Sequence, residues 1–209
     1  MKLTIPDKLS DITLAQFRQI EQLDDSGDLY WVRTALSILT ELEPDQIDLL
    51  SVGDMERIGD ILGRLFSYDD DDVPLQNIIE YQGQTYGFHP NLTNITVGEW
   101  ADLEQLLDKG WLENMGAVLS ILYRPVTIQT KHEYKIAPYV GYGEEAEEVW
   151  ADLTMDVVLG AVAFFLHTAS VLAIAFNSSS MDKAEARLSP TSGGGTLFST
   201  LWRKVTRSK

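Results

Sequence analysis

The sequence predicts a mainly α protein, in which a helical bundle surrounds a central apolar helix at about residues 155–176, with one or two small β-hairpins and a flexible C-terminal tail. Three observations support this prediction. In several segments apolar residues recur every three or four positions, as they do on one face of a helix. Residues that favour helix caps precede these segments. Finally, the twenty residues 157–176 carry no formal charge and are apolar on every side, which is typical of a central buried helix.

The N-terminal part of the chain contains the first helix signals. Residues 14–24 have apolar positions at a spacing of three, and Thr13 with Gln16 before them has the form of a capping box. After a break at residues 26–28, the helical period continues to about residue 42. Two helices are therefore predicted before Pro44.

Two further helices are predicted between residues 44 and 65. Pro44 is suited to a first helical turn, so it opens a short helix near 45–50. Ser51 with Asp54 then caps a longer helix that carries an apolar stripe to Leu65.

The period changes between residues 77 and 89. The sequence "NIIEYQGQTYGFH" has β-prone runs on either side of Gln82-Gly83, which predicts a hairpin. Further along, "VTIQTKHEYKI" is predicted to form either a second short strand pair or an extended crossing.

The stretch from residue 86 to residue 126 is dense in functional side chains, but its pattern is that of capped helices. Thr96 with Glu99 forms a capping box before a stripe that ends near Gly110, and another helix is predicted from about residue 112 to 123, stopping before Pro125. Arg124 is expected either to cap its helix or to pair with an acidic neighbour. The remaining helices are predicted at residues 143–152 and in the long apolar run.

Charge is unevenly distributed along the chain. The formal net charge is -16, but residues 177–209 carry six basic and two acidic residues, so the first 176 residues carry -20. This excess of carboxylates repels phosphate backbones and argues against nucleic-acid binding. We expect an acidic helical domain at residues 1–176, followed at 177–209 by a Ser/Gly-rich linker and a basic amphipathic segment.

No catalytic, cofactor-binding or metal-binding residue is predicted. The run Asp69 to Asp72 resembles the start of a calcium loop, but Val73 and Pro74 occupy positions that such a loop reserves for a ligand and a glycine. The three histidines lie far apart, and none has a second potential metal ligand three or four positions away in the sequence. The chain has no cysteine, which excludes disulfides and thiolate nucleophiles and fits a reducing cytosol. We therefore expect no enzymatic activity.

Residues 157–176 also allow a different interpretation. Their length approaches that needed to cross a bilayer, and the basic C-terminus would suit a cytoplasmic end. His167, Thr168 and Ser170 interrupt the run, and Asp156 precedes it directly. The buried helix is favoured, with a membrane-associated protein anchored by residues 157–176 as the alternative.

The end of the chain is a candidate partner-binding segment. Beyond the linker, a short segment combines apolar and basic side chains and is too short to form a stable helix alone. It is expected to fold against a partner or to remain a disordered terminus. Its candidate contact residues are Leu197, Phe198, Leu201, Trp202, Arg203 and Lys204.

Four stretches resemble a group of tailed-bacteriophage proteins: "IPDKLSDITLAQFRQI", "NLTNITVGEWADLE", "LSILYRPV" and "LTMDVVLGAVAFF". Some members of that group are similar to tail assembly chaperones or to other morphogenesis proteins. The resemblance covers about residues 5–166 and carries over no catalytic residues. It implies a morphogenesis protein that binds phage tail or virion proteins. It further implies a place in the bacterial host cytoplasm during assembly, or in the virion as a minor structural subunit. The acidic first 176 residues and the basic end also favour contact between copies of the protein.

Overall fold

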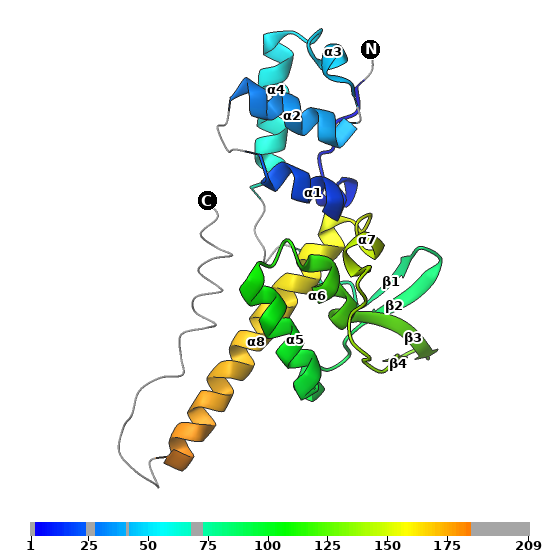
Figure 1. Ribbon diagram of the computed structural model, residues 1–209, viewed down its shortest axis with the longest axis vertical. Coiled ribbons are helices and arrows are strands. Elements are labelled where there is room, and N and C mark those ends of the chain that lie inside the picture. The colour runs from blue at the N-terminus through cyan, green and yellow to red at the C-terminus, as the bar shows by residue number, and fades with distance from the viewer. Residues whose placement is uncertain (1–2, 24–27, 41, 68–72, 185–209) are drawn as a thin grey trace. The chain divides into compact units, whose positions relative to one another are not determined.

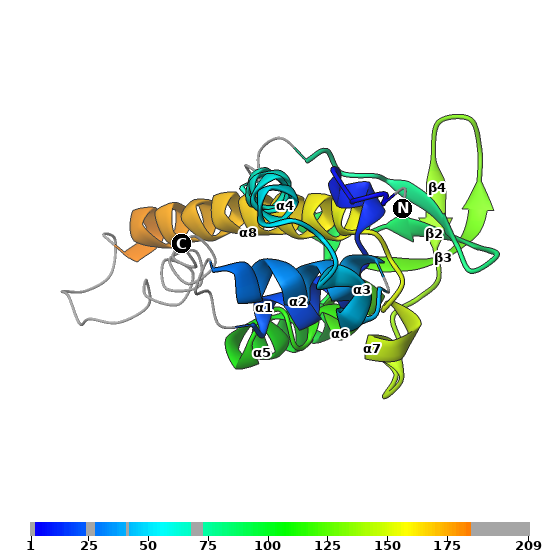
Figure 2. The same ribbon diagram turned by 90° about the horizontal axis from the view of Figure 1, so that it is seen from above.

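The structure is a computed structural model that describes residues 3–23, 28–40, 42–67 and 73–184, with side chains described as far as residue 169 (Figures 1 and 2). These residues form eight α-helices, two short 3-10 helices and four strands. In chain order the elements are η1 (Leu9–Asp11), α1 (Leu14–Glu21), α2 (Leu29–Thr40), α3 (Pro44–Ile47), α4 (Val52–Leu65), β1 (Ile78–Tyr81), β2 (Gln84–Phe88), η3 (Leu92–Asn94), α5 (Val97–Lys109), α6 (Met115–Leu122), β3 (Tyr123–Gln129), β4 (Tyr134–Ile136), α7 (Ala146–Val149) and α8 (Met155–Ala184).

The chain divides into two compact units. Unit 1 comprises residues 1–76 and 143–160, and unit 2 comprises residues 77–142 and 161–209. Each unit is thus built from two separate stretches of sequence. Helix α8 supplies its first six residues to unit 1 and the rest to unit 2.

Unit 1 is helical, and its helices begin where the capping signals predict. In α1 the hydroxyl of Thr13 accepts a hydrogen bond from the Gln16 amide at 3.2 Å, while the Gln16 side chain accepts one from the Thr13 amide at 3.0 Å. In α4 the hydroxyl of Ser51 accepts from the Asp54 amide at 3.1 Å. These contacts confirm both predicted caps and satisfy amides that have no partner within the helix.

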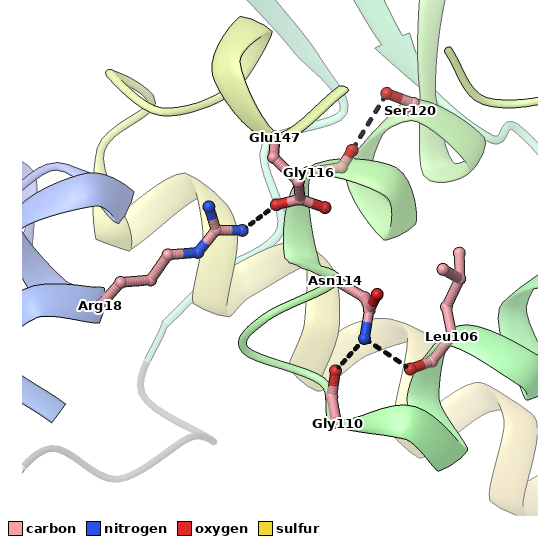
Figure 3. Close-up of polar contacts among 7 residues, drawn as sticks. All are labelled: Arg18, Leu106, Gly110, Asn114, Gly116, Ser120 and Glu147. Carbon is pink, nitrogen blue, oxygen red and sulfur yellow. Dashed lines mark hydrogen bonds and ion pairs between the residues drawn. The ribbon is translucent and has the colours of Figure 1, made fainter. Parts of the chain in front are cut away.

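Residues 143–160 are joined to the start of the chain by backbone hydrogen bonds. The amides of Leu14 and Ala15 donate to the carbonyls of Leu153 and Ala151, and the amide of Met155 donates to the carbonyl of Ile12, each at 2.9 Å. The first amides of a helix lack intrahelical partners. Here the carbonyls just before α8 accept from the first amides of α1, and a carbonyl just before α1 accepts from the first amide of α8. An ion pair between Arg18 of α1 and Glu147 of α7 adds a side-chain link (Figure 3).

The core of unit 1 consists of the apolar faces of these helices and of the first residues of α8. Phe66 packs against the rings of Phe17 and Trp31, with both centroid separations at 6.1 Å. Gly160 has a packing role, because a Cβ at this position would lie 2.6 Å from the carbonyl oxygen of Pro74. The largest fully buried side chains of the unit are Trp150, Ile12, Leu14, Leu36, Ile47 and Leu62.

Unit 2 contains a four-stranded antiparallel sheet in the order β1-β2-β3-β4. The hairpin between β1 and β2 is confirmed: Gln82 and Gly83 both have positive φ angles, 49° and 76°, as a two-residue type I′ turn requires. Strands β3 and β4 pair with each other, so the segment "VTIQTKHEYKI" forms a second strand pair and not an extended crossing. In both views the four strands lie next to one another (Figures 1 and 2).

The predicted fold class, a mainly α bundle with one or two small hairpins, is wrong. Phe88 of β2 pairs with Tyr123 of β3, and Tyr86 pairs with Pro125, so the two hairpins join into one sheet and the protein is mixed α/β. Helix α6 ends at Leu122, and the chain continues directly into β3 with Pro125 inside it. Hydrophobic periodicity reports local conformation and not which distant strands pair, which explains the error.

In unit 2, side chains cap both ends of helix α5. Helix α5 starts at the Thr96–Glu99 capping box and ends at Gly110, as predicted. The Asn114 amide group donates to the carbonyls of Gly110 at 2.7 Å and Leu106 at 3.4 Å, which satisfies acceptors that the end of the helix leaves free (Figure 3).

The apolar run that the sequence places at the centre of a bundle lies in α8. From Val157 to Ala169 most side chains are buried, whereas Phe164 and His167 are exposed. Among the helices of the described chain, none combines the length and apolarity required to span a bilayer. The predicted boundary at residue 177 falls inside α8, and residues 185–209 lie outside the described part of the chain, so the two-part domain organisation stays a prediction.

Candidate functional site

Unit 2 buries an ion pair between Glu99 and Arg124. The two residues are 1% and 8% exposed, and Glu99 Oε1 lies 2.7 Å from Arg124 Nη2. Glu99 Oε2 accepts a hydrogen bond from the Thr96 amide at 2.6 Å. Both carboxylate oxygens therefore have a partner, one of them charged.

Local structure brings these two residues together. Glu99 is the third residue of α5, where the capping box turns its carboxylate back toward the helix start. Arg124 is the second residue of β3, which pairs with Gly87 of β2. The sequence analysis left Arg124 with either of two roles, and the structure selects the pairing with an acidic residue.

His89 is the third member of this buried cluster. It directly follows β2, and its amide donates to the Leu122 carbonyl at 2.8 Å. Its Nε2 lies 3.8 Å from Glu99 Oε1, too long for a strong hydrogen bond. Within the described residues, His89 Nδ1 and Arg124 Nε are buried without a hydrogen-bond partner. Leaving such groups unpaired reduces stability by about 1–3 kcal/mol each.

The surroundings set the charge states of the cluster. Burial lowers the pKa of His89, and the positive charge of Arg124 acts in the same direction, although Glu99 opposes both. For Glu99, burial raises the pKa, but the hydrogen bonds from Thr96 and the charges of Arg124 and His89 together outweigh it and leave the pKa lowered. The cluster at neutral pH thus contains an ionised carboxylate, a guanidinium and a neutral imidazole.

Two tyrosines adjoin this cluster. The Tyr139 ring centroid lies 6.0 Å from the guanidinium carbon of Arg124, and its hydroxyl donates to Asp102 Oδ2 at 2.6 Å. Burial and the Asp102 hydrogen bond raise the pKa of Tyr139. The Tyr134 hydroxyl donates to the Phe88 carbonyl at 2.7 Å, and its ring occupies the space that a side chain at Gly87 would need.

This arrangement supports a structural role for the cluster. A general base needs a carboxylate oxygen or imidazole nitrogen that can reach a substrate proton, and Glu99 has both oxygens engaged inside the protein. Its contacts join the start of α5 to the second and third strands of the sheet. The sequence predicts the Glu99 cap but not the proximity of His89 and Tyr139 to it, because these residues lie far from Glu99 in the sequence.

Unit 1 presents a different kind of surface at residues 43–60, which we call the acidic corner. It covers α3, the following turn and the first part of α4, with six carboxylates and one arginine. Leu49 is 86% exposed and Val52 is 61% exposed. Arg33 of α2 holds the turn through hydrogen bonds to both carboxylate oxygens of Asp48, at 2.6 and 2.9 Å.

The structure locates some of the residues considered in the sequence analysis. His132 and His167 are exposed and far from His89 in the sequence, and the described residues contain no group of three or more side chains suited to hold a metal ion. Glu104 and Asp108 are exposed, whereas Asp102 is half-buried against Tyr139. The acidic run at 69–72 lies outside the described residues. So do all the candidate partner-binding residues, namely Leu197, Phe198, Leu201, Trp202, Arg203 and Lys204.

Comparison with known proteins adds no relative: no protein-family model matches the chain, and neither the curated proteins nor the solved structures give a match.

Proposed function

We propose that this protein is a non-enzymatic morphogenesis protein of a tailed bacteriophage, which binds other tail or virion proteins during assembly. It acts either as a tail assembly chaperone in the host cytoplasm or as a minor structural subunit of the virion. The phage assignment rests on the sequence resemblance of residues 5–166. The binding role rests on the acidic corner of unit 1.

The acidic corner is suited to binding a partner because it combines exposed apolar side chains with a high density of charge. Leu49 and Val52 lie three residues apart at the junction of α3 and α4, and both are largely exposed. The carboxylates around them keep such a surface hydrated in the free protein, while the apolar side chains gain free energy when a partner covers them. Charged neighbours also favour partners with basic residues.

The buried cluster of unit 2 supports the same interpretation. Its carboxylate is held by Arg124 and by the Thr96 amide, and these contacts join α5 to the sheet. Because both oxygens of Glu99 are engaged inside the protein, this carboxylate is not available as a general base, which agrees with a non-enzymatic role.

The first test places an amber codon at Trp150 of the gene in its phage genome. Electron microscopy of lysates from a non-suppressing host should then show heads without normal tails, and a suppressor host should restore complete particles. Normal tailed particles in the non-suppressing host would contradict the proposal.

A second test asks whether tail assembly requires the acidic corner. A plasmid copy carrying Leu49→Asp with Val52→Asp should fail to restore tails to the amber phage. A matched copy carrying Val140→Asp should restore them, because Val140 is 93% exposed but lies outside the acidic corner. Equal restoration by the two copies would remove the acidic corner from the binding role.

A further inference from the structure

We infer that the acidic corner of unit 1 is a docking site for the protein's own C-terminal segment, residues 197–209. The segment lies outside the described residues, but its sequence complements the charge and the exposed apolar side chains of the acidic corner.

The surface has a net charge of -5 over residues 43–60, and most of its carboxylates are exposed. Asp45, Asp48 and Glu56 surround the exposed side chains of Leu49 and Val52 in the sequence. Gly53 follows Val52, and a Cβ built there would meet nothing within 4 Å. The acidic corner is therefore open to an approaching chain.

The segment has the complementary composition. Residues 197–209 contain four basic residues and no acidic one. In a helix, residues at positions i, i+1, i+4, i+5 and i+8 would share one face, which the apolar residues of this segment match: Leu197, Phe198, Leu201, Trp202 and Val205. Opposite charge and a matching apolar face are the features by which a short segment folds against an acidic surface.

The distribution of charge over the rest of the chain also favours binding of the segment to unit 1. Unit 1 carries a net charge of -17, whereas unit 2 without its basic end, residues 77–142 and 161–176, carries only -3. A basic segment is thus attracted to unit 1 more strongly than to unit 2. Residues 189–196, which come after α8 and before the segment, have the Ser/Gly-rich composition of a flexible linker.

Hydrogen exchange followed by mass spectrometry tests the docking in the full chain. Amides of residues 197–209 should exchange at least about tenfold more slowly in the protein than in a synthetic peptide of the same sequence. The variant Leu49→Asp with Val52→Asp should abolish this protection, and 0.5 M NaCl should reduce it. Val140→Asp should leave it unchanged.

A charge exchange provides the most specific control. Arg203→Glu with Lys204→Glu should release the segment, and combining it with Asp45→Lys and Glu56→Lys should restore protection. Wild-type exchange equal to that of the free peptide would overturn the inference, as would equal loss of protection in the Leu49/Val52 and Val140 variants. The measurement uses purified protein only, so its outcome is independent of whether the phage role is correct.

Discussion

The two units of this protein differ in net charge and in whether their ion pairs are exposed or buried. Unit 1 contains 23 acidic and 6 basic residues, a net of -17, whereas unit 2 contains 9 acidic and 10 basic residues, a net of +1. Two ion pairs at the acidic corner of unit 1, Arg33–Asp48 and Arg57–Asp54, lie at the surface. Unit 2 instead buries Glu99 against Arg124.

This difference indicates where each unit is sensitive. Surface ion pairs contribute little to stability, so unit 1 depends on its apolar core, its helix caps and the backbone bonds between its two chain segments. A buried pair is costly to break, because the remaining charge has no partner in a region from which water is excluded. Substitutions in the buried pair of unit 2 should therefore lower stability strongly, whereas substitutions in the surface pairs of unit 1 should lower it weakly.

The largest expected effect comes from Arg124→Met. It leaves the buried Glu99 carboxylate without its cation and should lower the free energy of unfolding by about 3–5 kcal/mol. Hydrogen exchange of α5 and the sheet, measured at low urea, would report the loss. Replacing both charges, with Glu99→Gln and Arg124→Met together, should recover part of it.

The matched control in unit 1 is Arg57→Met, which removes the exposed partner of Asp54. The free energy of unfolding should change by no more than about 0.5 kcal/mol. If the Arg57 and Arg124 variants lost equal stability, the contrast between the units would be wrong.

A steric effect in unit 1 should be smaller than the effect of Arg124→Met in unit 2. Gly160→Ala places a methyl group against the Pro74 carbonyl oxygen, at a position where a Cβ would lie 2.6 Å away, and overpacking of this kind costs about 1–3 kcal/mol. In α4, Gly63→Ala meets nothing within 4 Å and should stabilise the protein by about 0.5–1 kcal/mol through helix propensity. Urea denaturation of both variants would show opposite signs, and stabilisation by Gly160→Ala would contradict the close contact.

Acid should weaken unit 2 through His89. Its pKa in the folded protein lies below the ordinary value of 6.5, so in the window below 6.5 the unfolded chain binds more protons than the folded one. The free energy of unfolding should therefore fall as the pH drops below about 6.5. His89→Gln should remove this slope, whereas the contribution of Glu99, with its lowered pKa, is lost only below about pH 4.5. A slope unchanged in the variant, measured by urea denaturation at each pH, would assign it to another group.

Salt should have the smallest effect, with its sign set by unit 1. Raising the NaCl concentration from 0.02 to 0.5 M screens the repulsion among the carboxylates and should stabilise unit 1 by less than about 1 kcal/mol. Unit 2, with almost no net charge, should respond less. Hydrogen exchange of α2 and α4, compared with α5 and α6, would separate the two responses.

The sequence predicted the features that depend on neighbouring residues. The caps at Thr13, Ser51 and Thr96 were predictable because each joins residues three positions apart. The Gln82-Gly83 turn was predictable because its conformation selects such residues. The pairing of β2 with β3 was not, because thirty-four residues separate Phe88 from Tyr123. The contact of Glu99 with Arg124 was predictable only as one of two alternatives for the arginine.

The division of unit 1 into two stretches of sequence has a consequence for synthesis on the ribosome. Helices α1 to α4 emerge first, but the amides of Leu14 and Ala15 find their acceptors only after residues 151–153 have been translated. The intervening residues 77–142 take about 3–13 s at about 5–20 residues per second. During that interval, the amides of Leu14 and Ala15 lack these acceptors, and the start of α1 is not yet joined to residues 151–153. Nascent-chain chaperones would have their main opportunity to bind at this stage.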